Sequence, residues 1–180
     1  MATSTYHGIL LNGPSSAGKT SIADAIVRTS ELPFVRLELD TFLGMIEFRH
    51  IDCEAIDGVN ETCERLVLGF QACVKAMASK GNLVLVDHVL QEPTWRQDLR
   101  MILAEIPLFQ VGFYCDDESL LARERTRGDR PIGLAKTQMH RVHLEQQYDL
   151  TLDTSGLAPQ EGANQILNHF MRSYQPAHTT

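Results

Sequence analysis

The most chemically specific part of the sequence is a run of small residues, NGPSSAGKTS, at positions 12–21. Gly13, Gly18, Lys19 and Thr20 match the pattern G-x-x-x-x-G-K-[ST], which is typical of loops that wrap around nucleotide phosphates. Glycines and small side chains let successive backbone N–H groups turn inward and form an anion-binding nest. The helix that follows directs its positive N-terminal end at the phosphates. The run therefore predicts nucleotide binding, and the alternative is a glycine turn that enters an ordinary helix.

Two residues of this run, and one acid farther along the chain, have side chains suited to ATP and Mg²⁺. Lys19 supplies a mobile cation for the β- and γ-phosphates, and the Thr20 hydroxyl suits Mg²⁺. Asp87 ends the apolar run LVLVD, where an acid can hold Mg²⁺ directly or through water. We expect ATP and Mg²⁺ as cofactors, with the nucleotide bound by Gly13, Pro14, Ser15, Ser16, Ala17, Gly18, Lys19, Thr20 and Ser21.

A second acid, Asp40 in LELDTFLG, follows another strand-like run. In open α/β sheets, ligands bind beyond the carboxyl ends of the strands. A carboxylate there can take the proton from a hydroxyl as it attacks the γ-phosphate. The alternative is that Asp40 caps a helix beginning at Thr41. His88, which follows Asp87, has two interpretations as well: a substrate contact or a structural hydrogen-bond donor.

Arginines concentrate in the stretch ARERTRGDRPIG at positions 122–133. Arg123, Arg127 and Arg130 share one face of a helix, at i, i+4 and i+7. A solvated face interleaved with acids is one interpretation. Beside a phosphate-binding loop, arginines before a glycine- and proline-rich hinge also predict a lid, which offsets charge on the transferring group and excludes water.

Apolar runs rich in β-formers alternate with helical patterns along the chain. This alternation predicts βαβ units around a mostly parallel sheet in one α/β domain over residues 1–180. Within it we expect the lid at about 123–140 and a segment covering the acceptor at about 41–60. The strand-like runs are 7–12, 34–39, 82–89, 108–115 and 149–154. After the helix that follows the loop, helices are expected over 60–80, 93–107, 117–127, 132–147 and 159–173.

Composition limits the partners of the chain. A formal net charge of −7 argues against nucleic acid, whose binding proteins usually carry a basic face. The apolar runs are too short to cross a membrane and no secretory signal is evident, so we expect a cytoplasmic protein without a membrane partner. The four cysteines lack ligand spacing for zinc, and each is expected to be a thiol. The acidic composition neither requires nor forbids a homo-oligomer.

Four stretches together resemble chloramphenicol phosphotransferase and its relatives: ILLNGPSSAGKTS, Asp40 after the second strand, LVDHV and ARERTRGDRPIGLAKTQMHRVHLEQQYDLTLDTS. The resemblance runs from Ile9 to the last helix, and the long block is more particular than the loop. It implies a P-loop NTPase fold like that of nucleoside-monophosphate kinases, with a five-stranded parallel sheet, flanking helices and an arginine-rich lid.

The same resemblance implies roles for individual residues. Asp40 takes the role of general base toward a primary hydroxyl, and Lys19 and the lid residue Arg130 act on the transferring phosphoryl group. Arg123 and Arg127 bind the nucleotide, and the LDTS stretch at 152–155 lies near the base. Two departures stand out: His88 replaces the second of the family's paired acids, and the segment 42–60 differs from that of the drug enzyme.

We therefore expect an ATP-dependent phosphotransferase (a kinase) that moves the γ-phosphoryl group to a hydroxyl of a small molecule. Chloramphenicol or a related antibiotic is the acceptor that the resemblance suggests first. One alternative is a kinase of a housekeeping metabolite, such as a nucleotide, sugar acid or sugar nucleotide. Another is a nucleotide-dependent switch that transfers nothing.

Overall fold

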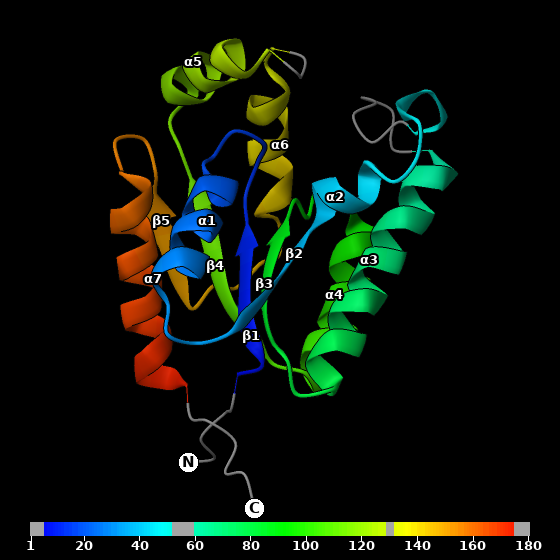
Figure 1. The fold of residues 1–180 in the computed structure, drawn as a ribbon. Coiled ribbons are helices and arrows are strands. Elements are labelled where there is room, and N and C mark those ends of the chain that lie inside the picture. The colour runs from blue at the N-terminus through cyan, green and yellow to red at the C-terminus, as the bar shows by residue number, and fades with distance from the viewer. Residues whose placement is uncertain (1–5, 52–59, 129–131, 175–180) are drawn as a thin grey trace, which may run out of the picture.

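Five short parallel strands form the centre of the protein (Figure 1). The computed structural model describes residues 6–51, 60–128 and 132–174. The sheet has the order β2-β3-β1-β4-β5, which places β1 between β3 and β4. The five predicted runs form these strands, with ends within one residue of the predicted ones. The strands are β1 (Gly8–Asn12), β2 (Phe34–Glu38), β3 (Leu83–His88), β4 (Phe109–Tyr114) and β5 (Leu150–Asp153).

Helices cover both faces of the sheet and the carboxyl ends of its strands. Figure 1 shows α1 and α7 on one face, α3 and α4 on the other, and α5 and α6 beyond the strand ends. Among the described residues, no helix is both long and apolar enough to span a bilayer. The predicted helices are α1 (Lys19–Thr29), α3 (Glu61–Ser79), α4 (Pro93–Glu105), α5 (Asp117–Arg127), α6 (Leu134–Val142) and α7 (Pro159–Ser173). The short helix α2 (Leu39–Leu43) was expected only in the alternative that starts a helix at Thr41, and the 3-10 turn (Phe48–His50) was not predicted.

The apolar core consists of two layers, one on each face of the sheet. Successive side chains of a strand point to opposite faces, so Ile9 and Leu11 pack with α1 and α7, whereas Leu10 packs with α3 and α4. All three are fully buried. Burial on both faces explains why β1 reads as a continuous apolar run. The core holds the strand ends in fixed positions, and the polar residues discussed below lie at those ends.

A partly buried polar network ties the chain that follows α6 to the end of β1. Asn12 Nδ2 donates to the carbonyl of Val142 at 2.8 Å and to the Tyr148 hydroxyl at 2.7 Å. His143 meets that hydroxyl through Nδ1 at 2.8 Å and the carbonyl of Phe113 through Nε2 at 3.1 Å. Because these bonds turn the chain back onto the sheet, α6 ends at Val142, and the prediction of a helix through residue 147 was wrong.

The cysteines follow the predicted pattern only in part. Cys73 is an exposed free thiol and Cys115 a buried one. Cys63 is disulfide-bonded, so the expectation of a thiol was wrong there, and Cys53 lies outside the described residues. Within the described ranges, no group of three or more His, Cys, Asp or Glu side chains could hold a metal ion.

The Tyr148 hydroxyl gives the polar network a measurable contribution to stability. The substitution Tyr148→Phe leaves His143 Nδ1 and one N–H of Asn12 without a partner in a partly buried site. We expect the free energy of unfolding to fall by about 1–2 kcal/mol in urea titrations. Tyr114→Phe is the control, because that exposed ring stacks on His143 outside the chain of bonds. An equal effect of both substitutions would contradict this assignment.

Candidate active site

The loop between β1 and α1 has the backbone shape of an anion-binding nest. Ser16 and Gly18 lie in the left-handed region, with φ of 59° and 88°, and Gly18 is the N-cap of α1. Alternation of this conformation with ordinary backbone turns successive N–H groups toward one side. Ser16 Oγ is buried and, among the described residues, has no hydrogen-bond partner. An unpaired buried hydroxyl and a nest opening beside a cavity fit a phosphate group.

The first glycine of the motif, Gly13, is needed because a side chain there would clash with the neighbouring strand, and not because of an unusual backbone angle. A Cβ at Gly13 would lie 2.6 Å from Cβ of Phe113 and 3.0 Å from its carbonyl oxygen. These atoms belong to β4, which pairs with β1 and cannot yield. Gly13 therefore allows the loop to start against the neighbouring strand.

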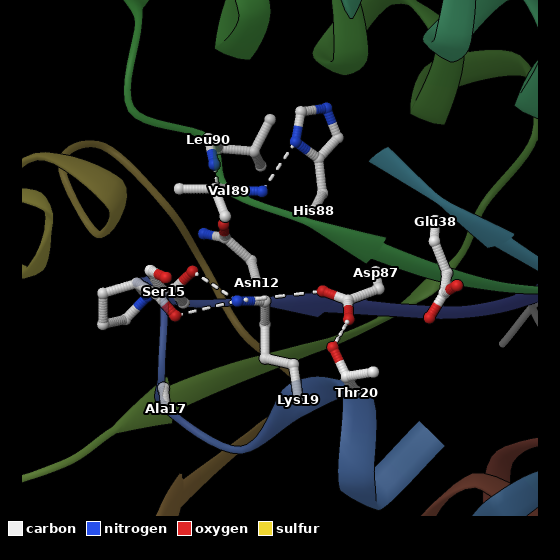
Figure 2. Close-up of polar contacts among 12 residues, drawn as sticks. Asn12, Ser15, Ala17, Lys19, Thr20, Glu38, Asp87, His88, Val89 and Leu90 are labelled. Carbon is white, nitrogen blue, oxygen red and sulfur yellow. Dashed lines mark hydrogen bonds and ion pairs between the residues drawn. The ribbon is translucent and has the colours of Figure 1, made fainter. Parts of the chain in front are cut away.

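Lys19, Thr20 and Asp87 meet where β1 and β3 end (Figure 2). Lys19 Nζ donates to the carbonyls of Gly13 and Pro14, at 2.9 and 2.8 Å, and lies 3.7 Å from Asp87 Oδ1. The Thr20 hydroxyl donates to Asp87 Oδ2 at 2.9 Å. The two predicted magnesium ligands are thus adjacent, and both offer the hard oxygen atoms that Mg²⁺ prefers.

The electrostatic surroundings of Asp87 favour a cation at this point. Burial raises the pKa of its carboxyl above the usual value, and the charges of Asp40 and Glu38 raise it further. Lys19 and the Thr20 hydroxyl act in the opposite direction. A divalent cation would relieve the repulsion among the three carboxylates, so the donor set fits Mg²⁺ bound together with phosphate oxygens.

A cavity of about 650 Å³ extends from this loop in two directions. One end lies beside β2, α2 and β3, and the other lies beside α5 and the segment that follows β5. Of the predicted site residues, ten line it: Ser15, Ser16, Gly18, Lys19, Thr20, Ser21, Asp40, Asp87, Arg123 and Arg127. Gly13, Pro14 and Ala17 also belong to the loop, but they are buried and do not line the cavity. Arg130 and residues 52–59 of the predicted acceptor segment lie outside the described residues.

Asp40 belongs to the first turn of α2, because β2 ends at Glu38 and α2 begins at Leu39. The alternative in which Asp40 caps a helix starting at Thr41 was wrong, since Glu38 occupies the N-cap position. Leu39 is buried, whereas Asp40 is exposed toward the cavity. The carboxylate therefore lies in the same cavity as Lys19.

His88 points away from the cavity, to the opposite face of β3 from Asp87 (Figure 2). Its side chain is buried between the rings of Phe70 and Trp95, and its Nε2 lies 2.9 Å from the amide nitrogen of Gln71. Its Nδ1 accepts the backbone N–H of Val89 at 2.8 Å. Of our two interpretations, the geometry favours the structural one, because consecutive strand residues face opposite sides.

Two of the predicted lid arginines, Arg123 and Arg127, lie on α5, at the far end of the cavity from Asp40. Arg123 joins the loop to the segment after β5, because Nη1 donates to the Ser16 carbonyl at 3.3 Å and Nη2 to the Thr154 carbonyl at 2.5 Å. Arg127 lines the cavity one turn later. Thr154, from the predicted base-proximal stretch, donates its hydroxyl to the Ala17 carbonyl at 2.8 Å.

Glu124 has a role that the sequence reading missed. It appeared there only as an acid between arginines, yet it is buried, and its carboxylate accepts the N–H groups of Gly133 and Ala135 at 2.7 Å each. Negative charge at a helix N-terminus is favourable, so Glu124 fixes the start of α6 relative to α5. A glutamate nine residues before a glycine is too weak a signal to predict this contact.

Gln138, on α6, also escaped prediction. Its Oε1 accepts the backbone N–H of Ser15 in the phosphate loop at 2.8 Å. Its Nε2 donates to Oε1 of Gln91 at 3.1 Å, and Gln91 follows β3 closely. Both glutamines are buried, with 6% and 5% of their surface exposed. Gln138 therefore holds the loop in register with the strand that carries Asp87.

Removing the Gln138 amide should weaken nucleotide binding. In Gln138→Leu the Ser15 N–H loses its partner inside the protein, which costs about 1–3 kcal/mol. We expect the Kd for AMPPNP to rise about tenfold in calorimetric titrations, with a lower Tm. Gln138→Glu keeps an acceptor for Ser15 and should lose less. Gln147→Leu, an exposed position, should change neither quantity; a normal Kd for Gln138→Leu would contradict this role.

The buried state of His88 predicts a pH dependence of stability. Desolvation lowers the pKa of His88 to about 3, whereas the unfolded chain titrates near 6.5. The contribution of neutral His88 to the free energy of unfolding is therefore fully present above pH 6.5. It is lost as the pH drops from 6.5 toward 3, by about 1.4 kcal/mol per pH unit. His143, with a pKa lowered to about 4 mainly by burial, adds a loss of the same sign.

The variant His88→Gln isolates this effect. Between pH 7.5 and 5.5 we expect its free energy of unfolding to decline by about 1.4 kcal/mol less than that of the unmodified protein. His169→Gln alters an exposed histidine and should keep the full decline. Equal slopes for the unmodified protein and His88→Gln in urea titrations would show that His88 is not buried in its neutral form.

Comparison with solved structures shows that this chain has the fold of P-loop kinases. An unliganded sugar kinase from Janibacter sp. HTCC2649 has a TM-score of 0.70 at 18% identity, covering 96% of this chain and 99% of that one. The tunicamycin resistance protein of Deinococcus radiodurans has 0.67 at 16%, covering 98% and 100%. The APS kinase CysC of Mycobacterium tuberculosis, in complex with AMPPNP and APS, has 0.65 at 18%, covering 92% and 99%.

Family membership rests on a separate comparison. No protein with a curated description matches the chain. A family model described as chloramphenicol phosphotransferase-like protein matches residues 7–171, which is nearly the entire chain. The phosphate loop, the acids at the strand ends and the α5–α6 block all fall within that range. The chain belongs to the chloramphenicol phosphotransferase-like family.

Proposed function

We propose that this protein transfers the γ-phosphoryl group of ATP to a hydroxyl of a small molecule. The observation that carries the proposal is the shared cavity: the phosphate loop with Lys19, and the exposed carboxylate of Asp40, line the same 650 Å³ space. A carboxylate across from a phosphate-binding loop suits a general base for an alcohol. A switch that only binds nucleotide has no use for an acid there.

The proposed reaction assigns a role to each of these groups. The acceptor hydroxyl attacks the γ-phosphorus, a new O–P bond forms, and the bond from the γ-phosphorus to the β,γ-bridging oxygen breaks to release ADP. Asp40 takes the hydroxyl proton, and Lys19 stabilises charge on the transferring group. Thr20 and Asp87 would hold Mg²⁺, which would neutralise part of the charge on the phosphates. Arg130 is assigned to the same transition state by family resemblance alone.

The nucleotide is proposed to extend from the loop toward α5. Arg123 and Arg127 line that end, and Leu157 and Pro159 add apolar surface suited to a purine ring. Ser15, Ser16, Gly18 and Ser21 complete the phosphate-binding part of the cavity. The predicted lid at 123–140 would cover this end when ATP is bound, which excludes water during transfer.

The acceptor is proposed to bind between β2, α2 and β3, with residues of 41–60 above it. Chloramphenicol or a related antibiotic is the first candidate, because the family is described by chloramphenicol and a similar fold occurs in a tunicamycin resistance protein. A kinase of a housekeeping metabolite is the second candidate, since the fold is shared with a sugar kinase and an APS kinase.

The central test is the substitution Asp40→Asn in the presence of ATP and a panel of antibiotics and sugar alcohols. We expect ADP release with one class of acceptor, and a phosphorylated product by mass spectrometry. The kcat of Asp40→Asn should fall about a hundredfold or more, because the amide accepts no proton, while the Kd for AMPPNP stays unchanged.

Glu31→Gln provides the matched control, as it removes an acid that is exposed, does not line the cavity and lies outside the segment 41–60. This variant should keep the kcat of the unmodified protein. Near-normal turnover of Asp40→Asn would remove the base assignment. ATP binding without product from any acceptor would favour the nucleotide-dependent switch instead.

A further inference from the structure

The acceptor end of the cavity is lined by three carboxylates from two adjacent strands and the helix between them. Glu38 ends β2 directly opposite Asp87 on β3, and Asp40 follows two residues later on α2. All three line the cavity. The three carboxylates therefore face the same bound group. An acceptor bound here lies beside them, and an anionic group on it would be repelled.

Among the described residues, the positive groups near this end are already engaged. Lys19 binds the loop carbonyls and lies beside Asp87, in the place expected for phosphate contact. Arg36 forms ion pairs with Asp24 and Glu38 and does not itself line the cavity. Of the described cavity-lining residues, the other cations are the α5 arginines at the opposite end. A bound complex of Mg²⁺ and ATP has a net negative charge, so it adds no cation for an acceptor carboxylate.

The described part of the segment expected to cover the acceptor adds no cation to the cavity. Residues 41–51 contain a single arginine and no lysine. That arginine, Arg49, is exposed and bonds to His50 rather than lining the cavity. A site for a carboxylate or phosphate acceptor would need Arg or Lys side chains at this end.

We infer, building on the proposed function, that the acceptor is an alcohol without an anionic group, and that Glu38 selects one that carries a protonated amine near its hydroxyl. Repulsion from three carboxylates penalises an anionic acceptor, and the same field attracts an ammonium group. Glu38 is half-buried and also accepts the hydroxyl of Thr41 at 3.4 Å, which holds it at the edge of the cavity. Asp40 is then left for proton transfer, and Asp87 for the metal.

The test uses matched acceptors that differ only in charge. One set is the deacylated amine of chloramphenicol, chloramphenicol itself, and the N-succinyl derivative of the amine. The other set is glucosamine, glucose and gluconate. Affinity for the complex of the full chain with AMPPNP and Mg²⁺ is measured by calorimetry, and kcat/KM with ATP is measured by ADP release.

Within the set of compounds that binds, we expect the amine to bind most tightly and the carboxylate to bind at least about tenfold more weakly. The difference in affinity between the amine and the carboxylate should become smaller in 0.5 M salt, because dissolved ions screen the interaction between the acceptor charge and the carboxylates of the site. A carboxylate that binds as tightly as the amine would overturn the inference, as would failure of every compound in both sets to bind.

Glu38→Gln assigns the preference to one side chain. This variant should lower the amine-to-carboxylate affinity ratio by about tenfold. Glu31→Gln, the same loss of charge at an exposed position outside both the cavity and the segment 41–60, should leave the ratio unchanged. If Glu38 serves only to anchor Arg36, the two variants will show equal ratios, and the inference fails.

Failure of this inference is distinguishable from failure of the proposed function. Efficient phosphorylation of gluconate or of the succinyl compound would keep the kinase proposal and overturn the charge selection. The predicted binding order without phosphorylation of any compound would keep the charge selection and overturn the kinase proposal.

Discussion

The arrangement of the site depends on burying one charged lysine at the end of β1. Lys19 is 6% exposed, and a buried ammonium is stable only where several acceptors surround it. Two loop carbonyls and Asp87 provide them, which requires the loop to curl back over β1 and requires β3 to end beside it. The parallel pairing of β1 with β3 brings these groups together, and two apolar layers hold that pairing in place.

Helix α6 also holds the phosphate loop and the end of β1 in place. Gln138 bonds to the phosphate loop, and Asn12 bonds to the last turn of α6. Arg96, buried on α4, donates to carbonyls at both Leu90 and Arg141. Helix α6 is therefore fixed to the sheet at several points, whereas α5 meets the loop chiefly through Arg123.

Sequence periodicity was sufficient for the strands and for most helices, because those elements depend on apolar residues close together in the chain. The orientation of Asp87 and His88 also follows from strand alternation, once the loop side of β3 is known. The contacts of Gln138 and Glu38 could not be predicted in this way. Gln138 lies 123 residues from its partner Ser15, and an amide has no periodic signature. The position of Glu38 beside Asp87 depends on the pairing of β2 with β3, which the sequence of β2 alone does not specify.

The two ends of the cavity are built from different parts of the chain, and this separates their chemistry. The nucleotide end uses the loop, α5 and the segment after β5, whereas the acceptor end uses residues 38–40 and β3. Because Leu39 is buried while its neighbours Glu38 and Asp40 line the cavity, one short turn carries both the proposed base and the proposed charge selector. Substitution at Glu38 can therefore alter acceptor charge preference without touching the phosphate loop.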